Sequence, residues 1–283
     1  DAPFYTEVRY KGTKTVAVSS DYGEMVKFGD IWLAPKQGTD AALAMAMGHV
    51  ILKEFHLENP SAYFTDYVKR YTDMPMLVML EERDGCHVPG QFLRASHLDG
   101  ALGERNNPEW KTLLIDGATN EVVVPNGTIG FRWGEGKVDG GAKVGRWNLE
   151  SRDGGSGREI DPVLTLKDRD GVVCPVGFAY FGGEGDDLQV RNVPAMRMRL
   201  ADGREVLVAT VYDLQMANYG IDRGLGGGNV ASDYAQDVPY TPAWQEKHTG
   251  VPPHLVIQVA REFAQNAHDT EGKSMVIVCA ALN

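Results

Sequence analysis

The sequence predicts an α/β protein: part of a Rossmann-like doubly wound domain, then an irregular α+β stretch, then the start of a second α/β domain. Three observations favour this class. A β-branched apolar run at 14–18 stops at small polar residues and an acid, as a buried parallel strand does at the rim of its sheet. A long apolar helical run follows Gly38. From about 81 to 200 the pattern breaks into short strand-like runs separated by glycine-rich turns.

Residues 1–57 are expected to form a strand, a turn, a second strand and a helix, as part of a cofactor-binding domain. The second strand is the apolar run that begins at Asp30 and closes at Pro35. Gly38 suits a tight turn, and Thr39 suits the N-cap of a helix that runs to about Phe55. Because this helix is apolar nearly all round at its start, we expect its first two turns to be buried.

Residues 58–245 are expected to form an irregular α+β region with glycine-rich loops. A helical stretch comes first, and an apolar run follows at 74–80. The segment 204–212 has the pattern of a strand and is expected to lead into a turn at 217–220. The glycine-rich segments 134–141 and 153–157 are typical of exposed loops.

Residues 246–283 are expected to form the first helix and strand of a second α/β domain. The helix should begin at Pro252 or Pro253, because proline is favoured in the first helical turn. Apolar residues then recur at helical spacing on one face: Val256, Val259, Ala260 and Phe263. The apolar run 274–283 is predicted to be a strand. Since the chain lacks an initiating Met and stops on this run, we expect it to be a piece of a longer polypeptide.

Composition excludes several classes of function. The formal net charge of −11 argues against general binding of nucleic acid or anionic membrane. No apolar run reaches the length of a membrane-spanning helix, so direct membrane insertion is not expected. Cys86, Cys174 and Cys279 are far apart and form no C-x-x-C pair, which predicts reduced structural thiols rather than a zinc or iron–sulfur site.

The candidate binding residues lie where the first two strands end and the helix begins. They are Ser19, Ser20, Asp21, Tyr22, Gly38, Thr39 and Asp40. Strand ends and a helix N-terminus at one rim favour an anionic, phosphorylated ligand. An acid just past a strand can accept from a ribose hydroxyl or a guanine edge, although it can equally be a turn-forming residue. Asp40 can also simply favour the helix dipole, by about 1 kcal/mol.

Other motifs carry no chemistry of their own. His49 and His56 lie seven apart on or near one helix, but no acid or further histidine completes a metal set. The glycine-rich segment 224–229 lacks the preceding strand and the Lys-Ser/Thr pair of a phosphate loop, so a flexible loop is predicted. No nucleophile elbow is present. The sequence therefore predicts no catalytic residue and no metal ligand within this chain.

Several long strings of residues resemble one family over nearly the whole chain. The matching strings are 5–16, 38–42, 63–67, 70–78, 106–111, 130–135, 217–220 and 240–244. They are similar to the catalytic alpha subunit of the membrane-bound respiratory nitrate reductases, molybdopterin oxidoreductases of the DMSO reductase superfamily. The resemblance is weakest at 136–195, and it marks the glycine-rich stretch near 136–146 as an insertion.

The resemblance implies that the candidate residues hold a molybdopterin guanine dinucleotide. The segment 19–22 would meet its guanosine end, and the motif 38–40 would bind the same dinucleotide. Ser20 stands where the family usually has proline. At the terminal strand Ala280 and Asn283 would make contact, while Cys279 and Ala281 stand where glycines are usual.

The resemblance also implies the activity and partners of the longer protein. That protein would reduce nitrate to nitrite at a molybdenum bis(molybdopterin guanine dinucleotide), with an iron–sulfur cluster whose ligands, like the molybdenum ligand, lie outside this segment. Its partners would be an iron–sulfur beta subunit and a quinol-oxidising membrane gamma subunit. It would lie as a peripheral subunit on the cytoplasmic face of the bacterial inner membrane.

Two alternatives remain from the residues alone. A nicotinamide-dependent dehydrogenase would need a glycine-rich fingerprint after the first strand, and 19–23 does not supply one. A non-catalytic binding or scaffold module would need no cofactor, and measuring molybdenum in the intact natural protein would distinguish it.

Overall fold

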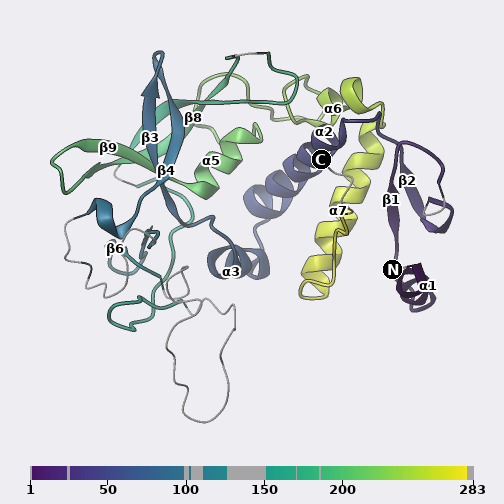
Figure 1. Ribbon diagram of the computed structural model, residues 1–283, viewed down its shortest axis with the longest axis horizontal. Coiled ribbons are helices and arrows are strands. Elements are labelled where there is room, and N and C mark those ends of the chain that lie inside the picture. The colour runs from purple at the N-terminus through teal and green to yellow at the C-terminus, as the bar shows by residue number, and fades with distance from the viewer. Residues whose placement is uncertain are drawn as a thin grey trace, which may run out of the picture. The chain divides into compact units, whose positions relative to one another are not determined.

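The computed structural model describes residues 2–23, 26–98, 102, 111–125, 151–169, 171–184 and 186–278. The chain divides into two compact units, each containing helices and strands (Figure 1). The first unit comprises Asp1–Ser61, Tyr219–Asp222 and Asn229–Asn283, and the second comprises Ala62–Asn218 and Arg223–Gly228. The α/β class is confirmed, while the Rossmann-like detail and the three-part domain division stay predictions.

A short parallel sheet begins the first unit. Strands β1 (Val16–Val18) and β2 (Ile31–Leu33) pair in parallel, with Val16 opposite Ile31, as the apolar runs predicted. A 3₁₀ turn, η1 (Val26–Phe28), connects them. Helix α1 (Ala2–Tyr10) precedes the sheet and was not predicted from the sequence. Its apolar side chains Phe4 and Val8 are exposed, so no buried stripe marked it as helical.

Three helices pack against one another next to this sheet. Their bounds are α2 (Asp40–Ile51), α6 (Pro242–Thr249) and α7 (Pro253–Asp269), and they contact one another (Figure 1). The core joins residues from both ends of the unit: Leu33, Leu43, Ala46, Val251, Val256 and Val259. Helix α7 begins and faces inward as predicted. Helix α6 was not predicted.

Helix α2 begins where it was predicted to begin, but its end and its burial differ from the prediction. It passes without a break into a π-helical segment, η2 (Leu52–Glu58), instead of ending near Phe55. The expectation that its first two turns are buried was wrong for Ala41 and Ala44, which are exposed. Only one face of the helix reaches the core, because the sheet it covers has just the two strands β1 and β2.

The predicted terminal strand is not formed in the part of it that the structure describes. Residues 274–278 carry no strand pairing, and the side chains from Met275 to Val278 are all at least 59% exposed. The segment bonds to α7 instead: the Asn266 Nδ2 donates to the Lys273 carbonyl, and the Ser274 hydroxyl donates to the Phe263 carbonyl. A strand needs a neighbouring backbone to satisfy its polar groups, and none runs alongside 274–278 within the described ranges.

The second unit contains a closed five-stranded barrel with strand order β3-β4-β7-β8-β9. The strands are β3 (Leu77–Arg83), β4 (Cys86–Phe92), β7 (Val172–Phe178), β8 (Gln189–Arg199) and β9 (Glu205–Thr210). All neighbours are antiparallel except β4 and β7, which close the barrel in parallel where His87 lies opposite Val176.

Smaller elements complete the second unit. They are α3 (Ala62–Tyr71), η3 (Ala95–His97), β5 (Leu114–Ile115), β6 (Val122–Val123) and α5 (Val211–Asn218). The predicted turn at 217–220 was wrong in part, because β9 leads directly into α5 and the chain turns only after it. The turn at 153–157 is described, whereas the loop 134–141 and the insertion near 136–146 lie outside the described residues. Within the described ranges, no helix is both long and apolar enough to cross a membrane.

Candidate functional site

The two parallel strands of the first unit end side by side. The Ser19 backbone N–H, just past β1, donates to the carbonyl of Leu33, the last residue of β2, over 3.1 Å. The segment that follows β2 leads within a few residues into α2 (Figure 1). The polar segments that follow both strands therefore start at one edge of the sheet, and we call residues 19–22 and 38–40 the strand-end site.

The first half of the strand-end site is polar and open to solvent. The Ser19 hydroxyl donates to the Asp21 carboxylate at 2.9 Å, and Asp21 and Ser20 are both exposed. Tyr22 is 66% exposed and meets the ring of Trp32 edge-on, with 5.3 Å between the ring centroids. The Trp32 indole N–H donates to the Ser19 carbonyl at 2.9 Å and so holds this segment against β2. A carboxylate with one hydroxyl donor in this arrangement has lone pairs left for a ligand.

Trp32 is the residue that the sequence analysis missed here. In a parallel strand alternate side chains face opposite ways, so Trp32 points away from its neighbours Ile31 and Leu33, which pack in the core. A large aromatic residue at an outward position of such a short strand was the available signal.

The second half of the site is the turn into α2. Gly38 has a φ of +74°, the left-handed region that favours glycine, and a Cβ placed there would meet no atom within 4 Å. Thr39 occupies the N-cap position as predicted, but its hydroxyl does not accept from the helix. It donates instead to the Lys36 carbonyl at 2.6 Å. Asp40, half-buried, is the acid of the first turn.

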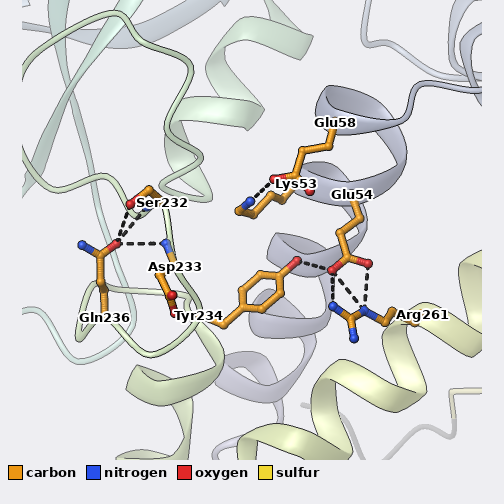
Figure 2. A network of polar contacts seen from close by, with 8 residues as sticks. All are labelled: Lys53, Glu54, Glu58, Ser232, Asp233, Tyr234, Gln236 and Arg261. Atoms are coloured by element: carbon orange, nitrogen blue, oxygen red, sulfur yellow. Dashed lines mark hydrogen bonds and ion pairs between the residues drawn. The ribbon is translucent and has the colours of Figure 1, made fainter.

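A second polar cluster lies at the other end of the α2–η2 helical run. The Glu54 carboxylate accepts from the guanidinium of Arg261 in α7, at 2.6–3.0 Å, and from the Tyr234 hydroxyl at 2.7 Å (Figure 2). Partial burial would raise the pKa of Glu54, but the hydrogen bonds from Arg261 and Tyr234 outweigh it and lower the pKa. Burial and the carboxylate together raise the pKa of Tyr234. The Glu54 carboxylate therefore ties together three segments: η2, α7 and the chain around Tyr234.

Buried charges in the second unit are likewise engaged. The Asp213 carboxylate accepts from Arg223 at 2.7 Å, from the Thr165 hydroxyl at 2.6 Å and from the Leu166 N–H at 2.7 Å. Arg223 and Asp213 are both almost fully buried. This ion pair fixes Arg223 and so anchors the start of the glycine-rich segment 224–229. The segment itself contains no lysine that could bind a phosphate.

The cysteines and histidines form no metal site in the described ranges, where no group of three or more potential ligands is close enough to hold an ion. Cys174 is buried, and burial raises the pKa of its thiol to about 11. His49 is a core residue whose Nδ1 lies 2.7 Å from the Tyr219 carbonyl oxygen. The candidates Ala280 and Asn283, with Cys279, lie outside the described residues.

No protein-family model matches this chain. Curated relatives match it over its whole length. It is 57% identical to the respiratory nitrate reductase 1 alpha chain of Escherichia coli and 42% identical to the nitrate reductase alpha chain of Bacillus subtilis, in both cases over 100% of this chain. A more distant relative is the perchlorate reductase subunit alpha of Dechloromonas aromatica, 25% identical over 99% of this chain. The chain spans only 22–23% of the length of these relatives.

Proposed function

Because this chain matches a segment of respiratory nitrate reductase alpha chains along its whole length, we propose that it is part of such a subunit and that the whole protein reduces nitrate to nitrite. The observation that carries this proposal is the 57% identity over all of the chain. The strand-end site then has a role: it holds the guanosine and pyrophosphate end of a molybdopterin guanine dinucleotide.

The residues present fit such a ligand. Asp21 is exposed and its carboxylate can accept from the N–H donors of a guanine edge. Gly38 leaves open space at the turn, where a backbone can approach a phosphate closely. Because the Thr39 hydroxyl donates to Lys36, it does not cap α2. The N–H groups that begin the helix form the positive end of its dipole and are not occupied by that hydroxyl.

When bound, the cofactor supplies the oxygen-atom transfer and passes on the electrons, and the protein supplies binding and orientation. Ser19, Ser20, Asp21 and Tyr22 would hold the guanosine, and Gly38 and Thr39 would lie at its phosphate side. Asp40 would accept from the N–H donors of the guanine base. Ala280 and Asn283 would complete the contacts. In this proposal the chain would contribute no catalytic residue and no metal ligand, and the iron–sulfur ligands would belong to the remainder of the subunit.

The partners and location follow from the same family. The subunit would receive electrons from an iron–sulfur beta subunit, which is served in turn by a quinol-oxidising membrane gamma subunit. It would lie at the cytoplasmic face of the bacterial inner membrane as a peripheral subunit.

The test is the molybdenum and guanine content of the intact natural protein, compared with Asp40→Ala. Loss of a charged acceptor facing the base costs about 1.5–3 kcal/mol, whereas loss of a first-turn acid costs the helix about 0.3–1 kcal/mol. Cofactor content should therefore fall more than the thermal stability of the cofactor-free form. Molybdenum-free wild-type protein from cofactor-replete cells would favour the scaffold alternative, and full occupancy with a collapsed melting temperature would make Asp40 only a helix-dipole residue.

A further inference from the structure

A buried polar chain connects the end of α6 to the strand-end site. Thr249, the last residue of α6, and Gln245, one turn before it, are both fully buried. The Thr249 hydroxyl donates to the Gln245 Oε1 at 2.6 Å and accepts from the Val251 N–H at 2.9 Å. The Gln245 amide then donates to the Val251 carbonyl at 2.7 Å. These three bonds close a ring around the point where the chain leaves the helix.

The same residue holds the segment that leads into α2. The Lys36 N–H donates to the Thr249 carbonyl at 2.9 Å. The Lys36 carbonyl in turn accepts from both the N–H and the hydroxyl of Thr39, at 3.2 and 2.6 Å. The backbone of one residue, Lys36, thus joins the buried ring on one side and the start of α2 on the other.

The turn at the end of α6 leaves room for Lys36 to approach Thr249. Gly250 is the C-cap in the left-handed conformation, with a φ of +77°. The Lys36 Cε lies 3.7 Å from where a Cβ on Gly250 would be. The Lys36 stem therefore packs over the carboxyl end of α6, where a cation is favoured by the helix dipole.

We propose that Gln245 and Thr249 are positioning residues of the strand-end site. They fix the Lys36 backbone, and the Lys36 carbonyl keeps the Thr39 hydroxyl away from the helix. The N–H groups that begin α2 are then not occupied by that hydroxyl and can meet a phosphorylated ligand. The identity of that ligand rests on the proposed function. The geometry of the segment that leads into α2 is independent of the proposed function, because buried groups of this chain alone set it.

Burial explains why two polar residues are used for this purpose. A fully buried polar group that loses its partner is costly, so a satisfied ring has one well-defined arrangement. Apolar contacts are not directional and would allow the segment after α6 to shift. Hydrogen bonds of 2.6–2.9 Å are directional and fix the orientation of the Thr249 carbonyl. A site that must present backbone N–H groups to a phosphate needs that fixed direction.

The test uses Thr249→Val, which keeps the side-chain shape and removes the hydroxyl, and Thr249→Ser, which restores it. Tyr234→Phe is the matched control, because it removes one hydroxyl hydrogen bond of the same unit, to Glu54 (Figure 2). Gln245→Met probes the ring from its other side if Thr249→Val does not fold. Amide hydrogen exchange is measured on the intact protein made in cells without the cofactor.

We expect the amides of Lys36 and Thr39 to exchange at least tenfold faster in Thr249→Val and near the wild-type rate in Thr249→Ser and Tyr234→Phe. In cofactor-replete cells, Thr249→Val should lose several-fold more bound guanine than Tyr234→Phe. Unchanged Lys36 exchange in both Thr249→Val and Gln245→Met, or equal acceleration in Tyr234→Phe, would overturn the inference. Absence of guanine from the wild-type protein would count against the proposed function alone, since the exchange measurement needs no ligand.

Discussion

Even one methyl group added at Gly48, inside α2, should destabilise the fold. A Cβ on Gly48 would lie 2.3 Å from Cε1 of the Tyr219 ring, whereas carbon atoms in good contact are about 3.5–4.0 Å apart. The ring has little freedom to retreat, because it packs against the Tyr240 ring with 6.1 Å between centroids. The Tyr219 carbonyl is also held by the His49 ring at 2.7 Å.

The expected change in the free energy of unfolding of Gly48→Ala is the difference between two opposing effects. Alanine is favoured over glycine in a helix interior by about 1 kcal/mol. Overpacking a filled site costs about 1–3 kcal/mol, and a contact this short belongs near the top of that range. Gly48→Ala should therefore lower the free energy of unfolding by about 1–2 kcal/mol. With a urea m-value of about 2 kcal/mol per molar, the midpoint should fall by about 0.5–1 M.

Urea unfolding followed by circular dichroism measures this change in stability. Repeating Gly48→Ala in a Tyr219→Ala variant tests whether the contact with the Tyr219 ring causes it. When Tyr219→Ala has removed the ring, Gly48→Ala should become neutral or stabilising by up to about 1 kcal/mol, because only the helix preference remains. If Gly48→Ala destabilises equally in both backgrounds, the contact with Tyr219 is not the reason that position 48 is glycine.

Two further predictions concern buried charge. Arg223→Met should destabilise the protein by about 3–5 kcal/mol, because it leaves the Asp213 carboxylate buried without its cation, and the double variant with Asp213→Asn should recover part of the loss in the same urea assay. Burial lowers the pKa of His56 below its usual 6.5. Below pH 6.5 the unfolded chain therefore binds a proton at His56 more readily than the folded chain does, and the free energy of unfolding should fall as the pH drops. His56→Gln should flatten the pH dependence of the urea midpoint between pH 5 and 7, and an unchanged slope would show that other groups cause it.

The elements that the sequence predicted are those whose burial has a simple period. The β-branched runs around Val16 and Ile31 became paired strands, and the spacing of Val256 and Val259 placed α7 correctly. Each of these elements buries one face against the same core, so its apolar residues recur at a regular spacing that can be read from a short stretch of sequence. Helix α6 escaped detection because buried polar residues such as Gln245 and Thr249 interrupt its apolar pattern.

The barrel could not be predicted from local pattern, since it depends on which strands meet. Its closure brings His87 of β4 opposite Val176 of β7, two residues far apart in the chain. In the strand-end site the sequence indicated the residue types but not their partners. The hydroxyl of Thr39 bonds to Lys36 because Lys36 is held by Thr249, a contact that no spacing in the sequence encodes.

The first unit is discontinuous in the chain, and this affects how it can be made. Its core requires Leu33 and Leu43 to meet Val256 and Val259, yet the stretch 62–218 is synthesised between them. At about 5–20 residues per second, a ribosome takes about 8–30 s to translate that stretch. During this interval α2 lacks the contacts that α6 and α7 later provide, while the barrel strands have already been made. The early segment is therefore exposed to chaperone binding for that time, and slowing translation within 62–218 should lengthen the time it spends bound to one.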